Sequence, residues 1–131
     1  MTRPFRFGLQ AYSSSTPSDW RELAKKTEDL GFSSFHLADH YVGEGPALEA
    51  ANHPLQNLAA LPAMTVAAEA TESIRIGCRV LCCDYHEPVV LAKEVATIDW
   101  FSEGRLELGL GAGWIQSCLL YTSDAADDSL R

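Results

Sequence analysis

The sequence has no long apolar run and no concentration of positive charge. No stretch reaches the roughly 18 consecutive apolar residues that a transmembrane helix needs, and the N-terminal MTRPFRFGLQ lacks the apolar segment of a signal peptide. The 10 Lys and Arg residues are dispersed among 18 Asp and Glu residues, which gives a net charge of -8. This balance disfavours a nucleic-acid or anionic-membrane partner. We therefore expect a cytoplasmic protein that binds neither.

Cysteine is scarce and its spacing is unsuited to cross-linking. The four cysteines are Cys78, Cys82, Cys83 and Cys118. Cys82 and Cys83 are adjacent, which suits neither ordinary disulfide geometry nor the usual C-x-x-C zinc spacing. Cys78 and Cys82 would be a conceivable pair of zinc ligands, but no second pair accompanies them. We expect reduced cysteines in or near a strand, and no bound metal.

Apolar residues make up 47% of the 131 residues, enough for one domain with a core. Alternating or continuous apolar runs predict strands at 5–10, 32–38, 74–81 and 105–111. A helix should begin with Thr16 as N-cap and Pro17 at its first position, and Gly31 should end it. Further helices are expected at 55–72, opened by Pro54, and from Pro88 to Gly104, with a loop at 42–52. The apolar sides of the first and last helices are Trp20, Leu23, Ala24, Thr27 and Leu30, and Val89, Leu91, Ala92, Val95, Ala96 and Trp100.

Strands that alternate with helices predict an α/β fold with a parallel sheet. A doubly wound open sheet and a (β/α)8 barrel both fit this order. The turn after the first strand, AYSSSTPS, lacks the G-x-G-x-x-G of a dinucleotide-binding fold. Gly111 and Gly113 form a lone G-x-G after the fourth strand, which is weak evidence for any ligand.

Three segments together resemble the luciferase-like monooxygenases, and within them the branch that depends on the deazaflavin coenzyme F420. They are 38–40 (ADH), 84–88 (DYHEP) and 104–114 (GRLELGLGAGW), the last being the most specific. The resemblance implies a TIM (β/α)8 barrel with its reaction at the carboxyl ends of the strands. Residues 1–117 would then supply the first four β/α units, a half barrel. Residues 118–131 instead resemble translated sequencing adapter, and we expect a non-native tail there; a short amphipathic fourth helix is the alternative.

The same resemblance assigns roles at the strand ends. It implies that His40 faces the redox ring and the substrate, where an imidazole can move a proton near neutral pH. The alternative is an Asp-His pair that serves a turn or a cap. It also implies a non-prolyl cis peptide near 81–83, which we do not expect to hold in half a barrel. The residues expected to bind cofactor are Asp39, Cys82, Cys83, Asp84, Gly111, Ala112 and Gly113; those expected at the substrate pocket are Tyr12 and Trp114.

The other histidines receive structural interpretations. His36 lies inside a strand and should be packed or hydrogen-bonded, and His53, before Pro54, should lie in a loop. His86 is expected in solvent, with Glu87 near the start of a helix. Trp114 stands where the sugar-phosphate dehydrogenases of the resembled branch have a carboxylate, which points away from that activity and toward an apolar substrate, unless Trp114 only packs at the barrel edge.

Three functions follow as expectations. The first is an oxidoreductase that moves a hydride between coenzyme F420 and an organic small molecule, with His40 as acid or base. The second is a monooxygenase that uses FMN and molecular oxygen. The third is a non-catalytic truncated fragment whose parent, expected to be a homodimer, is the enzyme. The substrate and the direction of hydride transfer stay open.

Overall fold

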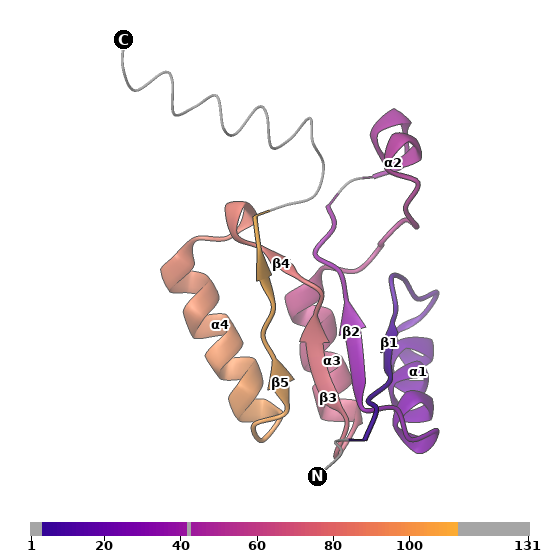
Figure 1. Ribbon diagram of the computed structural model, residues 1–131, viewed down its shortest axis with the longest axis vertical. Helices are drawn as coiled ribbons and strands as arrows, with labels where there is room; N and C mark the ends of the chain where they lie inside the picture. The colour runs from indigo at the N-terminus through magenta and orange to yellow at the C-terminus, as the bar shows by residue number, and fades with distance from the viewer. Residues whose placement is uncertain (1–3, 42, 113–131) are drawn as a thin grey trace.

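Four short strands run parallel in the order β1-β2-β3-β5, and three helices cover one face of this sheet (Figure 1). The computed structural model describes residues 4–41 and 43–112. The strands of the sheet are β1 (Gly8–Gln10), β2 (Ser34–Leu37), β3 (Arg75–Cys78) and β5 (Leu106–Glu107). The covering helices are α1 (Pro17–Asp29), α3 (Ala60–Ala70) and α4 (Pro88–Phe101). The predicted α/β class and parallel pairing are therefore confirmed.

Strand register separates an apolar face from a polar one. Leu9, Phe35, Ile76 and Leu106 are cross-strand partners and pack with the helices in the core. The neighbouring row, on the opposite face because side chains alternate, is Gln10, His36, Gly77 and Glu107. His36 Nε2 lies 3.1 Å from Glu107 Oε2, and Arg6 donates to Glu107 Oε1 at 2.6 Å. The prediction of a hydrogen-bonded His36 is confirmed.

Two predicted strands are each divided in two. After β3 a cis peptide bond joins Arg79 to Val80, and the chain resumes as β4 (Leu81–Cys82). After β5 it resumes as β6 (Leu110–Gly111), which pairs with β4 in parallel. The expectation that no cis bond would hold was wrong, and the bond lies before 81–83. It lies at the bend between β3, paired with β2 and β5, and β4, paired with β6.

Helix α1 forms as its sequence predicts. Thr16 Oγ1 accepts the N–H of Asp19 at 3.1 Å, Pro17 is the first helical residue, and Gly31 has a φ of 79°. Trp20 is buried and donates its indole N–H to the Ala63 carbonyl of α3 at 2.9 Å. Leu30, predicted on the apolar stripe, is exposed because it caps the helix.

The segment between β2 and β3 differs from its prediction. The expected loop at 42–52 contains helix α2 (Pro46–Ala51), which stands away from the sheet (Figure 1). The helix expected from 55 begins only at Ala60. Pro62 explains the later start, because proline fits the first turn of a helix but would break the interior of one that began at 55.

Helix α4 begins at Pro88 as predicted, but its buried stripe is narrower. Leu91, Val95 and Ile98 are buried, at positions i, i+4 and i+7. Trp100 is 75% exposed and Val89 is 78% exposed, so their placement on the packed side was wrong. The tightly packed side faces only α3 and the sheet, and these two side chains fall outside that contact.

The amino ends of the strands are fastened by two charged side chains. Arg105 donates to the carbonyl oxygens of Ala68, Thr71, Ile74 and Ser102, at 2.8 to 3.1 Å, and so caps the end of α3. Glu28, at the end of α1, accepts the N–H groups of Glu72, Ser73 and Ile74. These bonds hold α1, α3 and β3 together on the side away from the strands' carboxyl ends.

Glu28 should make stability depend on acid. Burial alone would raise its pKa, but the hydrogen bonds from Ser73, Ile74 and Glu72 lower the pKa from 4.5 to about 2. A depressed folded-state pKa gives stability that is complete above 4.5 and is lost as the pH falls toward 2. We expect Glu28→Gln to lower the free energy of unfolding by about 1–3 kcal/mol at pH 7, measured by urea denaturation, with the difference from wild type vanishing near pH 2. An equal difference at both pH values would contradict this.

Gly77 should tolerate no side chain. A Cβ atom there would lie 2.5 Å from the Glu107 carbonyl oxygen and 2.8 Å from the His36 ring. The backbone of β5 cannot withdraw without breaking its pairing, so we expect Gly77→Ala to cost about 2 kcal/mol of unfolding free energy. Gly43→Ala is the matched control, because its added Cβ would meet nothing within 4 Å. Equal denaturation midpoints for the two variants would disprove the close contact.

Candidate functional site

The carboxyl ends of the strands collect the predicted site residues at one edge of the sheet. Asp39 and His40 follow β2, and Cys82 ends β4. Cys83 and Asp84 lie in the single turn of 3-10 helix η1 (Cys83–Tyr85), and Gly111 pairs with Cys82 across β4 and β6. Ala112 follows Gly111. Gly113 and Trp114, with the whole predicted tail 118–131, lie outside the described residues.

Asp39 is the buried centre of this edge. Its side chain is fully buried, and Oδ2 accepts the Cys82 N–H at 3.0 Å. His86 donates from Nε2 to the same oxygen at 2.7 Å. Asp39 therefore joins the end of β2 to the connection between β4 and α4. Its direct contact with a cofactor stays a prediction, and the observed role is to position the loop that carries Cys83 and Asp84.

His86 was missed by the sequence interpretation, which placed it in solvent. Its side chain is only 11% exposed, because the ring turns inward to Asp39. The available signal was positional: His86 follows β4, the continuation of β3, and Asp39 follows β2, which pairs with β3. The carboxyl ends of parallel strands meet at one edge of a sheet. Hydrogen bonding to Asp39 fixes which ring nitrogen of His86 carries a proton.

His40 lies beside Asp39 but in a different environment. Its ring meets the His53 ring edge-on at a centroid distance of 4.3 Å, and His53 in turn meets Tyr12 at 4.9 Å. Burial lowers the pKa of His40 and His53 lowers it further, while the charge of Asp39 acts in the opposite direction. His40 is thus a neutral imidazole near pH 7, able to accept a proton from one nitrogen and to donate a hydrogen bond from the other.

The three cysteines that the structure describes are free thiols, and two of them are unsuited to nucleophilic chemistry. Burial, aided by the negative charge of Asp39, raises the pKa of Cys78 to about 12. Burial likewise raises the pKa of Cys82. A buried thiol that stays protonated is a poor nucleophile. Cys83 is exposed at the edge of the site, where its side chain can contact a ligand.

Gly109 and Gly111, which follow β5, lie close to the side chain of Val80. A Cβ on Gly111 would lie 2.5 Å from Val80 Cγ2, and one on Gly109 would lie 2.8 Å from Val80 Cγ1. The absence of side chains there lets β6 pass over Val80, next to the cis bond. Close approach to a neighbouring segment is therefore the observed reason for Gly109 and Gly111. Ala112 is exposed at the rim.

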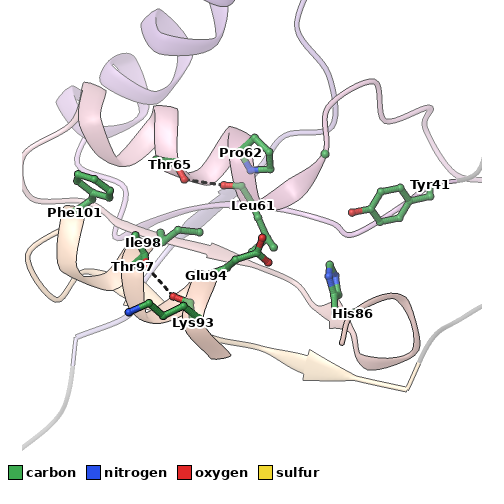
Figure 2. Close-up of a pocket in the computed structure, with 11 residues that line it drawn as sticks. Tyr41, Leu61, Pro62, Thr65, His86, Lys93, Glu94, Thr97, Ile98 and Phe101 are labelled. Carbon is green, nitrogen blue, oxygen red and sulfur yellow. Dashed lines mark hydrogen bonds between the residues drawn. The ribbon is translucent and has the colours of Figure 1, made fainter. Parts of the chain in front are cut away.

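A groove of about 500 Å³ lies beside the site, between α3 and α4 (Figure 2). Tyr41 and His86 lie at one end of it, and Phe101 lies at the other. Burial and the charge of Asp39 raise the pKa of Tyr41, so its phenol stays protonated. The groove thus reaches Asp39 from the helical side of the sheet, through His86.

Two features of the described residues bear on partners. No group of three or more His, Cys, Asp or Glu side chains in 4–41 and 43–112 is placed to hold a metal ion. Among the described helices, none combines the length and apolar character needed to cross a bilayer.

Comparison with known proteins identifies the family. The family model of the luciferase-like monooxygenases matches residues 1–130. The chain is 35% identical over 98 residues to the F420-dependent glucose-6-phosphate dehydrogenase of Amycolatopsis mediterranei. The matched region covers 74% of this chain and 28% of that protein. The chain belongs to the luciferase-like monooxygenase family, which has F420-dependent and flavin-dependent members.

Solved structures agree with this assignment. The coenzyme F420-dependent tetrahydromethanopterin reductase of Methanopyrus kandleri matches with a TM-score of 0.68 at 27% identity, over 90% of this chain and 29% of that one. The FMN complex of the oxygenating constituent of 3,6-diketocamphane monooxygenase from Pseudomonas putida has the same fold, with a TM-score of 0.69 at 20% identity over 88% and 32%. The chain spans less than half of the length of the curated relatives that it matches.

Asp39→Asn should loosen the site. The amide keeps the shape of the carboxylate but loses the charge that accepts from both Cys82 N–H and His86, so we expect about 2–3 kcal/mol lower unfolding free energy. Hydrogen exchange should show faster exchange of the Cys82 amide. Asp84→Asn, the same change on an exposed side chain of the next turn, is the control. Unchanged protection of Cys82 in Asp39→Asn would contradict the anchoring role.

Proposed function

We propose that this chain is the amino-terminal part of an oxidoreductase that transfers a hydride between coenzyme F420 and an organic small molecule. The observation that supports this most is the placement of His40 at the carboxyl edge of a parallel sheet, together with Cys83 and Gly111. Burial and the neighbouring His53 lower the pKa of its imidazole. Relatives named for F420 dependence support the choice of cofactor. The substrate, its polarity and the direction of transfer belong to the whole protein, for which we favour a cytoplasmic homodimer.

The rim suits a planar redox ring because Gly111 and Ala112 present backbone with little side chain there. Cys83 and Asp84, on the same rim, are exposed to such a ligand, while Cys82 contributes its amide to Asp39. Bound deazaflavin would supply the hydride chemistry. This chain's own residues orient the reactants, and His40 would accept or return the proton at an imidazole nitrogen.

A second candidate is an FMN-dependent monooxygenase. The description of the family model and the FMN-bound diketocamphane enzyme, which shares the fold, support it. Both candidates use the same edge of the sheet, and His40 serves as acid or base in either. The distinction lies in the molecule that exchanges electrons with the bound coenzyme, which is an organic substrate in the first case and molecular oxygen in the second.

For the 131-residue chain taken alone, we propose a non-catalytic half barrel. In the part of the chain that the structure describes, no helix covers the polar face of the sheet. Phe5 is also exposed, and the exposed Leu108 and Leu110 line a hollow against α4. In a closed barrel that face is the packed interior. Exposed apolar surface and strand edges favour association. A pure sample of this chain that turned over F420 or FMN would overturn this part of the proposal.

The function is tested in a chimera in which residues 1–112 replace the matching segment of a complete F420-dependent relative. Anaerobic turnover of reduced F420 is the expected result, and oxygen consumption with reduced FMN would favour the second candidate. His40→Gln should lower kcat at least about a hundredfold, because it removes acid–base catalysis, while cofactor fluorescence titration shows retained binding. Glu22→Gln, on the exposed side of α1, is the control. Full activity of His40→Gln would refute the role of His40.

A further inference from the structure

The loop between α2 and α3 places a second histidine on top of the first. His53 precedes Pro54, and its Nδ1 lies 3.1 Å from the Pro54 carbonyl oxygen. A carbonyl only accepts, so Nδ1 must carry the proton of this hydrogen bond. The residue before a proline is also confined to extended backbone. The hydrogen bond and the following proline therefore both restrict His53, in the loop where the sequence predicts it.

The held ring closes over His40. The two imidazoles meet edge-on at 4.3 Å with an interplanar angle of 75°, and Tyr12, from the loop after β1, braces His53 at 4.9 Å with an angle of 77°. Three rings from three separate loops thus form a row at the rim: Tyr12, His53 and His40. The row is fixed by ring packing and does not use the residues that carry the family resemblance, apart from His40.

The surroundings of His40 oppose a positive charge. The titratable groups that act on it are His53, from the opposing loop, and Asp39, from its own strand end. Asp39 accepts hydrogen bonds from the Cys82 N–H and from His86, and these bonds weaken the electrostatic effect of its charge on His40. Protonating His40 would place a cation against a second imidazole, and protonating both would place two cations about 4 Å apart.

We propose that His53 is a positioning residue for the reaction at His40: it covers the imidazole and keeps it neutral, so that His40 begins the reaction as a proton acceptor. The role of His53 in the reaction rests on the proposed function, whereas its effect on the charge of His40 does not. The direction of the His40 pKa agrees with it. Tyr12 acts one step further out, by holding His53 in place.

The test is a proton titration of the 131-residue chain by NMR with 13Cε1-labelled histidine. His53→Phe keeps a flat ring but removes its charge, and we expect the His40 midpoint to rise by about half a pH unit. His53→Ala removes cover and charge together, and the midpoint should rise further. His36, paired with Glu107 on the polar face, is the internal reference that should not move. Tyr12→Phe keeps the bracing ring and should leave His40 unchanged.

A His40 midpoint within 0.1 unit of wild type in both His53 variants would overturn the inference. Circular dichroism checks that each variant is folded, and His53→Phe, which preserves ring packing, serves if His53→Ala is not. The outcome is separable from the proposed function. If the chimera does not use F420 but the His40 midpoint shifts in the His53 variants, only the proposed function is contradicted. If the chimera is active but the His40 midpoint does not shift, only this inference is contradicted.

Discussion

One buried carboxylate holds the functional edge of this sheet together. Asp39 follows β2, and its Oδ2 accepts hydrogen bonds from the last residue of β4 and from His86 beyond it, 43 and 47 residues further along the chain. A charge removed from water must be compensated by good hydrogen bonds, and here a backbone N–H and an imidazole N–H provide them. The position of the loop with Cys83 and Asp84, and the inward turn of His86, both depend on this anchor.

The two ends of the sheet are stabilised by different means. At the amino ends, Arg105 and Glu28 form hydrogen bonds with backbone groups of neighbouring elements, and these contacts stabilise the fold. At the carboxyl ends, Asp39 supports side chains that are themselves able to bind or react. This separation matches the general behaviour of parallel α/β folds, in which strand carboxyl ends carry chemistry and the opposite ends carry stability. It explains why His36, well paired but near the middle of the polar face, is a structural histidine while His40 is a candidate for catalysis.

Local rules predicted much of the fold from the sequence. Thr16, Pro17 and Gly31 bound α1 as capping rules require, and the parallel order follows from alternating strands and helices. The misses have a common cause in contacts between distant residues. His86 is inward because Asp39 is there, and Trp100 is exposed because it lies on the side of α4 opposite Leu91, Val95 and Ile98. The late start of α3 is an exception that was available in the sequence, since Pro62 forbids a helix interior at its position.

The two residues after β2 contact different partners although they are adjacent in the sequence. Asp39 accepts hydrogen bonds from Cys82 and from His86, which lies just before α4. His40 instead meets the ring of His53. An Asp-His sequence pair would ordinarily suggest an imidazole made more basic by its neighbour. Here burial and His53 outweigh the charge of Asp39, and the result is a histidine whose pKa is lowered beside an aspartate.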